Sequence, residues 1–205
     1  VLAGVLGSGD QVDAVIIQGV GYFDDRHVGN DKAVTLNMAL RGADAANYAL
    51  NSTTLTDDIG TITPLAEVQF VGDPDGDWSD ATNWAGGAIP DGDNVLKVVI
   101  PQDTATVYDS DAFGTTSAAI ENNGVVRFES VNAFSLDNVV SGTGDIEQRG
   151  SGLLTLGGTN TFSGNVDIAG LSLKLAHATA LGQGSLVADG GTLSLADGVT
   201  LESLR

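Results

Sequence analysis

Short runs of alternating apolar and polar residues, separated by turn residues, recur along most of the chain. Clear examples are residues 13–18, 32–40, 95–100 and 124–128. Alternation with period two is typical of a β-strand with one buried face, and the Asp-Gly and Asn-Gly pairs between such runs indicate tight turns. The helix-compatible segments, residues 42–48 and 176–181, are at most about two turns long, which is marginal without tertiary packing. The pattern therefore predicts an all-β protein.

The last third of the chain contains a repeat of leucine pairs. The pairs Leu154/Leu156, Leu173/Leu175 and Leu193/Leu195 recur at intervals of about 20 residues, with polar residues on the opposite face. A parallel β-helix needs this arrangement, because equivalent strands stack about 4.8 Å apart and point alternate side chains into one core. A globular sandwich would not place such pairs in register three times. We therefore predict a right-handed parallel β-helix of about seven coils, on the order of 35 Å long.

The N-terminal part lacks this period. Its alternating apolar positions predict two or three strands, the last of which ends at the segment Gly60-Thr-Ile-Thr-Pro64. Proline cannot donate a backbone hydrogen bond, so Pro64 closes that strand. The sequence thus predicts two parts: a small β-sandwich-like module at residues 1–64, and a β-helix at residues 65–205 that opens with the Asp- and Trp-rich segment 72–95.

The charge of the chain excludes two classes of partner. It has 27 acidic and 8 basic residues, and its formal net charge is -19. A nucleic-acid binder needs basic residues to displace counterions from phosphate, and anionic lipid headgroups repel such a surface too. No stretch approaches the roughly 18 apolar residues of a membrane span. We therefore expect neither nucleic-acid binding nor membrane insertion.

The chain has no cysteine and begins with valine. Absence of cysteine fits a reducing compartment, and it fits equally a secreted protein that is stabilised without disulfides. No signal sequence follows Val1, so we interpret the chain as a piece of a longer polypeptide.

The acidic turn after residue 72 is a candidate calcium site. Its carboxylates are Asp73, Asp75, Asp77 and Asp80. Ca²⁺ takes six to eight oxygen ligands, and closely spaced carboxylates can supply them. The spacing matches an EF-hand loop only loosely, so the alternative is an exposed turn whose aspartates bond their own backbone. No other cofactor is indicated.

Trp78 and Trp84 lie within the same segment and suggest a ligand site. Aromatic faces stack on sugar rings, which makes the two tryptophans candidate glycan-binding residues. The alternative is that they plug the open end of the solenoid, where the first coil would otherwise leave apolar side chains in water.

Two groups of motifs resemble families of bacterial exoproteins. Residues 28–34, 40–50 and 59–64 are similar to the C-terminal two thirds of a YDG-type repeat domain, found in filamentous-haemagglutinin-like exoproteins. The tyrosine-aspartate-glycine segment that names this family would precede Val1, so the resemblance implies a module truncated at its N-terminus. The second group resembles the autotransporter-associated β-strand repeat of passenger domains, and it comprises residues 122–128, 140–147, 150–156, 158–164 and 181–187. The segment around Trp78 and Trp84 looks like the double-tryptophan segment that often opens such β-helices.

The resemblance implies a secreted or cell-surface bacterial adhesin, exported as an autotransporter or by two-partner secretion. It also implies an outer-membrane export pore as a partner. Such chains cross the pore unfolded, which accounts for the missing cysteines. The expected function is that of a structural stalk, in adhesion, aggregation or biofilm formation.

Two alternatives to the stalk remain open at the level of the sequence. The first is a module that binds a host or biofilm glycan or a matrix protein. The second is a carbohydrate-active enzyme, which needs two carboxyl groups about 5 to 9.5 Å apart in a groove. A lyase-type site also needs basic residues beside its acids, and the sequence shows Lys97, Arg127, Arg149 and Lys174 as scattered and unaccompanied. We therefore expect no enzymatic activity.

Overall fold

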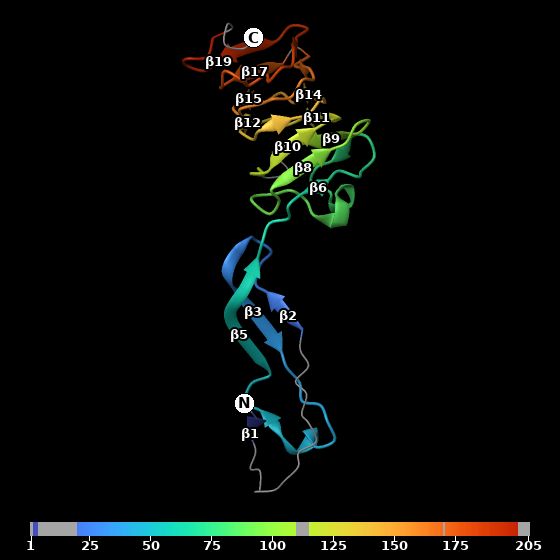
Figure 1. Cartoon of the computed structure of the whole chain (residues 1–205), viewed down its shortest axis with the longest axis vertical. Helices are drawn as coiled ribbons and strands as arrows, with labels where there is room; N and C mark the ends of the chain where they lie inside the picture. Colours follow the sequence, from blue (N-terminus) through green and yellow to red (C-terminus); the bar gives the residue numbers. More distant parts are fainter. Residues whose placement is uncertain (1, 4–19, 110–114, 170, 201–205) are drawn as a thin grey trace. The chain divides into compact units, whose positions relative to one another are not determined.

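The chain divides into two compact units, Val1–Thr63 and Pro64–Arg205. The structure is a computed structural model that describes residues 2–3, 20–109, 115–169 and 171–200 (Figure 1). The division between the units lies one residue from the boundary predicted by the sequence. The strand predicted at residues 13–18 lies outside the described residues.

Unit 1 contains antiparallel β structure. The strands β2 (Gly21–Phe23), β3 (Gly29–Asn37) and β5 (Thr54–Ile62) form a three-stranded sheet in which β3 is central. A short pair joins β1 (Leu2–Ala3) to β4 (Ala49–Leu50). A sandwich needs two apolar sheet faces packed together, whereas Phe23 and Leu55 stay 47% and 51% exposed. The described residues of the unit therefore show antiparallel sheets, and the sandwich-like packing of residues 1–64 stays a prediction.

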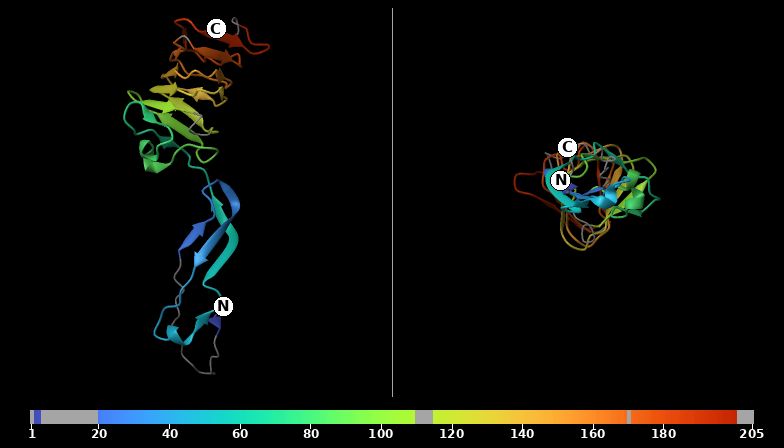
Figure 2. Two further views of the ribbon diagram at one scale, coloured as in Figure 1. Left: turned by 180° about the vertical axis from the view of Figure 1, so that it is seen from behind. Right: turned by 90° about the horizontal axis from the view of Figure 1, so that it is seen from below.

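Unit 2 is a parallel β-solenoid, as predicted from the repeat. Three parallel sheets run along it, and their strands stack one above another (Figures 1 and 2). The first sheet contains β6 (Val68–Gln69), β8 (Lys97–Ile100), β10 (Ala119–Asn122) and β13 (Val140–Ser141). The second contains β7 (Gly76–Asp77), β9 (Ala105–Tyr108), β11 (Val125–Phe128), β14 (Asp145–Gln148), β16 (Val166–Asp167) and β18 (Leu186–Val187). The third contains β12 (Phe134–Leu136), β15 (Leu154–Leu156), β17 (Ser172–Leu175) and β19 (Thr192–Leu195).

The strand registers show how much sequence each turn takes. Val68 pairs with Val98, and Val98 pairs with Ile120, so the first turn is the longest of the series. Later turns are shorter and nearly constant, as in the steps from Ile146 to Val166 and from Leu154 to Leu173. The six strands of the longest sheet therefore make about five turns, fewer than the seven predicted. The first turn is half as long again as the later ones, and its ten additional residues account for about half a turn of this difference.

The leucine pairs lie in the register that their spacing predicted. Leu154 pairs with Leu173, and Leu173 pairs with Leu193. Leu154 and Leu173 are buried, whereas Leu193, in the last described strand, is 37% exposed. The partial exposure of Leu193 fits its place in the last described strand, because each turn of a solenoid contacts its neighbours.

A column of glycines permits the turns to stack closely. Gly124, Gly144, Gly164 and Gly184 occupy every twentieth position of this part of the chain. A Cβ atom on any of them would lie 2.0 to 2.3 Å from the carbonyl oxygen of the equivalent residue in the preceding turn. No real Cβ contact is that short, so these positions require glycine for the strand spacing to be kept.

A buried asparagine joins three successive turns. The Asn160 carboxamide oxygen accepts a hydrogen bond from the Val140 backbone N–H at 2.9 Å, and its Nδ2 donates to the Ala180 carbonyl at 2.8 Å. Val140 lies one turn before Asn160, in the last strand of the first sheet, and Ala180 lies one turn after it. The side chain therefore continues the hydrogen bonding where the strand ladder ends, because buried backbone groups need a partner.

Helical structure in the described residues consists of three short 3₁₀ turns. They are η1 (Ala45–Asn47), η2 (Ala81–Asn83) and η3 (Ala85–Gly87). Both η2 and η3 lie in the long first turn of the solenoid. Across the described ranges, the structure contains no helix with the length and apolarity that a membrane crossing demands.

Candidate functional site

The two tryptophans lie in the core of the first solenoid turn. Trp78 is fully buried and Trp84 is 2% exposed. Their rings pack edge to face with centroids 4.7 Å apart, and Trp84 contacts Phe70 in the same manner at 5.4 Å. Trp78 in turn packs against Tyr108 at 4.9 Å. The apolar core begins with this aromatic cluster.

Hydrogen bonds fix both indole rings in this position. Trp78 Nε1 donates to the Pro90 carbonyl at 3.0 Å, and Trp84 Nε1 donates to the Trp78 carbonyl at 2.7 Å. Burial of Tyr108 beside them raises the pKa of its phenol to about 12, because the apolar surroundings disfavour the phenolate. Sugar stacking needs an open ring face, and here neighbouring side chains cover both rings. The burial therefore supports the core-packing interpretation of Trp78 and Trp84.

The four predicted calcium ligands do not converge. Asp77 Oδ1 accepts from the Ser79 backbone N–H at 2.7 Å and from its hydroxyl at 2.8 Å. Asp80 Oδ1 accepts from the backbone and hydroxyl of Thr82, and these hydrogen bonds lower the pKa of Asp80. Each carboxylate thus accepts hydrogen bonds from the residue two positions later in the chain, as aspartates do in turns.

The other two aspartates of this turn differ from Asp77 and Asp80. Asp75 forms an ion pair with Arg127, and Asp73 is exposed and closes the turn with its carbonyl oxygen, which accepts from the Gly76 N–H. Within the described part of the chain, no three His, Cys, Asp or Glu side chains are placed to share one metal ion. The geometry therefore gives the calcium site no support, and calcium binding stays a prediction.

A line of ion pairs crosses the second sheet on its outer face, a feature we call the charge ladder. Its members are Asp75, Arg127, Glu147, Arg149 and Asp167. Arg127 Nε donates to Glu147 at 2.8 Å, and Arg149 Nη2 donates to Asp167 at 2.9 Å. Arg127, Glu147 and Asp167 stand on β11, β14 and β16, so the ladder joins three successive turns. Partly shielded networks of this kind stabilise more than isolated surface pairs do.

The sequence interpretation missed these pairs. It treated the basic residues as unaccompanied, yet Arg127 and Arg149 have acidic partners, and Lys97 pairs with Glu67 and Glu121. The signal was present in the spacing, because Arg127, Glu147 and Asp167 follow nearly the same period as the core leucines. A register that aligns the core also aligns the outward residues beside it.

The charge ladder predicts a particular loss of stability in acid. The hydrogen bond from Arg149 is the main cause that lowers the pKa of Asp167 below its ordinary value of 3.8. A carboxyl group whose pKa is lowered by folding stabilises the folded protein at pH values above its ordinary pKa. This stabilisation is lost as the pH falls through the pKa that the group has in the folded protein. We expect Asp167→Asn to destabilise unit 2 at about pH 6, and the difference from the wild type to shrink below about pH 3.8. Urea unfolding at a series of pH values measures this difference.

The control for this experiment is Asp189→Asn, which removes one exposed carboxylate elsewhere on the solenoid. Comparing the two variants separates the ladder from the general relief of repulsion that acid brings to a chain of net charge -19. A pH-independent effect of Asp167→Asn would contradict a role for the charged ladder.

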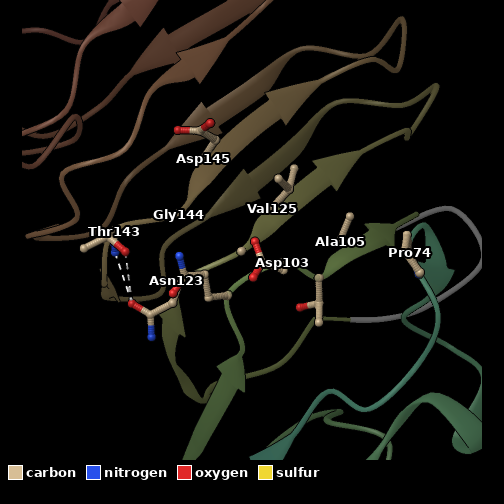
Figure 3. A pocket seen from close by; sticks show the side chains of 11 residues that line it. Pro74, Asp103, Ala105, Asn123, Val125, Thr143, Gly144 and Asp145 are labelled. Atoms are coloured by element: carbon tan, nitrogen blue, oxygen red, sulfur yellow. Dashed lines mark hydrogen bonds between the residues drawn. The ribbon is translucent and has the colours of Figure 1, made fainter.

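A hollow in the surface of unit 2 lies beside the charge ladder and has a volume of about 360 Å³ (Figure 3). We call it the trench. It is formed by residues 102–105, 123–125 and 143–145 of three successive turns, with Pro74 at its edge. Gly124 and Gly144 of the glycine column contribute no side chains to it. Close stacking of the turns therefore also creates a hollow along the solenoid.

The trench has a polar end and an apolar end. Asn123 and Thr143 lie together at one end, where Asn123 Oδ1 accepts from the Thr143 backbone N–H at 3.2 Å (Figure 3). Pro74 and Ala105 lie at the other end, and Asp103 stands between the two groups. The trench thus places hydrogen-bonding groups and apolar surface within reach of one ligand.

Among the described residues, the carboxyl groups whose pKa is shifted have lowered pKa values. The pKa values of Asp25, Asp80, Glu121 and Asp167 are lowered, mainly by hydrogen bonds from Lys32, Thr82, Lys97 and Arg149 respectively. A glycosidase needs the opposite shift in its general acid, which must hold a proton near neutral pH. These four groups are therefore suited to ion pairing and capping rather than to acid catalysis.

Comparisons with known proteins relate the chain to bacterial adhesins. A family model described as the YDG domain matches residues 1–55. The chain is also similar to the adhesin BmaC autotransporter of Brucella suis biovar 1 (strain 1330), with 38% identity over 69 residues. That alignment covers 34% of this chain and 2% of the relative, so the chain spans only a small part of the relative's length. No solved structure matches. The predicted YDG resemblance is thereby confirmed for the N-terminal part, and the similarity to an autotransporter adhesin supports the adhesin-like assignment.

Proposed function

We propose that this chain is a display segment of a secreted or cell-surface bacterial adhesin, in which the solenoid acts as a stalk. The observation that carries this proposal is the continuous parallel stack in unit 2, whose turns repeat with a nearly constant period and keep polar side chains outside. Each turn adds one strand spacing to the length, about 4.8 Å. The length of the stalk therefore increases in proportion to the number of residues in the repeated turns.

Links between turns suit a stalk that bears load along its length. The charge ladder joins β11, β14 and β16, and Asn160 joins three turns from within. In a solenoid, the stability of the array comes from interfaces between neighbouring turns. The negative surface discourages lateral pairing with other strands, because like charges repel at short range.

Export fits the same proposal. The chain contains no cysteine, so no disulfide closes a loop that would obstruct threading through an outer-membrane pore. Folding can then proceed from turn to turn outside the cell, since each turn buries its surface against the previous one. The similarity to an autotransporter adhesin supports this route.

Replacing the stalk tests the proposal on living cells. We would compare cells that produce the protein with cells in which residues 64–205 are deleted, or replaced by a solenoid of unrelated sequence with the same number of turns. The readouts are attachment of the cells to an epithelial monolayer and antibody access to a tag in unit 1. A stalk predicts that deletion reduces both readouts and that the unrelated solenoid restores both.

The result that contradicts a pure stalk is equally specific. If the unrelated solenoid restores antibody access but not attachment, residues 64–205 contribute contacts of their own. Repeating the attachment assay in chelator and in added calcium checks the predicted dependence on Asp73, Asp75, Asp77 and Asp80. Attachment that does not change with calcium would remove that prediction.

A further inference from the structure

We propose that the trench on unit 2 is a binding site for a neutral, linear glycan. This goes beyond the display role, does not depend on it, and places the ligand away from the buried Trp78 and Trp84. The proposal rests on the shape of the trench, on its mixture of surfaces and on its charge. A volume of about 360 Å³ is within the range of small-ligand sites.

The mixture of surfaces matches the chemistry of a sugar. A pyranose ring has apolar C–H faces and hydroxyl groups around its edge. Pro74, Ala105 and Val125 offer apolar surface to the trench, while Asn123 and Thr143, which hydrogen-bond each other, make one end of it polar (Figure 3). A ligand that is apolar on one face and polar at its rim therefore fits better than a purely apolar one.

Two side chains of the first turn of the trench remain open to a ligand. Gln102 and Asp103 are exposed, and both line the trench. Asp103 has φ of 63°, in the left-handed region, which fixes it at the tip of its turn. Carboxylate and carboxamide groups on a preformed turn can bond paired sugar hydroxyls without a large loss of entropy. By contrast, the Thr104 hydroxyl already donates to the Pro101 carbonyl at 2.7 Å, which helps to hold this turn.

The charge of the trench decides between classes of glycan. Asp103 and Asp145 both line it, and the whole chain has a net charge of -19. Uronic acids and sulfated sugars would be repelled, because two like charges in a shared site disfavour binding. A neutral sugar instead donates its hydroxyl protons to these carboxylates, in charge-assisted hydrogen bonds.

The length of the trench indicates an oligosaccharide. Its three turns span two strand spacings, about 10 Å along the solenoid. A single sugar ring would fill only part of that length. We therefore expect affinity to increase from monosaccharide to oligosaccharide and then to level off once the trench is filled.

The test uses the full chain and defined oligosaccharides. Isothermal titration calorimetry would measure binding of cellohexaose, maltohexaose and chitohexaose, with a hyaluronan hexasaccharide as the anionic comparison. The trench variant is Gln102→Ala/Asp103→Gly, because glycine keeps the left-handed backbone that Asp103 adopts. We expect at least one neutral hexasaccharide to bind saturably, and the trench variant to weaken it about tenfold or more.

A matched variant controls for the loss of the same groups elsewhere. Gln183→Ala/Asp189→Gly also removes one carboxamide and one carboxylate, from exposed turn positions outside the trench. It should bind the hexasaccharide as the wild type does, and circular dichroism should show equal melting of all three proteins. Glycines 124 and 144 are left unchanged, because a side chain there would disturb the stack itself.

Three outcomes would overturn the proposal. They are absence of binding by every neutral hexasaccharide, equal binding by the trench variant and the wild type, and preferential binding of hyaluronan. None of these outcomes bears on the stalk, whose test replaces the whole solenoid. The glycan site and the display role are therefore tested independently of each other.

Discussion

Replacing Trp84 with alanine is expected to lower the free energy of unfolding of unit 2 by about 4 kcal/mol, the typical cost of removing a buried aromatic side chain. The indole is 2% exposed, contacts the rings of Phe70 and Trp78, and donates a hydrogen bond to the Trp78 carbonyl. Alanine leaves a cavity and an unpaired carbonyl in the first turn. Urea unfolding followed by circular dichroism measures the change.

Trp84→Phe provides the graded control for this experiment. Phenylalanine keeps an aromatic ring in the cluster but loses the N–H donor, so we expect a loss of stability between those of the wild type and Trp84→Ala. The chain has two tryptophans, Trp78 and Trp84, so the fluorescence of either variant reports on the first turn through Trp78. Unchanged melting of Trp84→Ala together with lost glycan binding would contradict the packing role and favour a stacking surface.

The substitution Gly164→Ala is expected to cost about 3 kcal/mol, at the upper end of the usual penalty for overpacking. The added Cβ would lie 2.1 Å from the Gly144 carbonyl oxygen and 2.5 Å from its carbonyl carbon. Both atoms belong to backbone that is held by the adjacent turn, so neither can move aside cheaply. Thermal and urea unfolding of unit 2 test this expectation.

Ser163→Ala is the control for the glycine substitution. Ser163 precedes Gly164 in the same turn, and its side chain is exposed. Removing the hydroxyl should change the unfolding free energy by less than about 0.5 kcal/mol, as is usual for surface positions. Equal stability of Gly164→Ala and Ser163→Ala would show that the turns can separate without penalty, and the glycine column would then have no role in close stacking.

The alternation of apolar and polar residues was sufficient to predict the fold class and the register of the solenoid. Leu154, Leu173 and Leu193 recur at nearly constant spacing, and the structure aligns them in adjacent strands. This worked because each turn repeats the same local pattern and buries it against the next turn, so local and tertiary preferences agree. Pro64 follows β5, which ends at Ile62, for a similarly local reason, because proline cannot donate to a strand ladder.

The number of turns could not be predicted from the alternation of apolar and polar residues. The prediction of seven assumed that every turn is as short as the leucine repeat, whereas the first turn extends from Val68 to Val98. The additional residues include η2 and η3 and bring Trp84 beside Phe70 and Trp78. Loop length is set by how the segment packs, which no short sequence pattern specifies.

The tertiary structure likewise determined which partner each polar side chain contacts. Asp77 and Asp80 bond the residues two positions ahead, and Asp75 reaches Arg127 on another strand. The four neighbouring aspartates therefore do not converge on one point in the described structure, because a carboxylate takes the nearest donors available to it. The sequence by itself determined the period, the strands and the buried leucines. Tertiary packing decided which outward residues meet across turns, that Trp78 and Trp84 are covered, and that glycines stacked at every twentieth residue leave a trench.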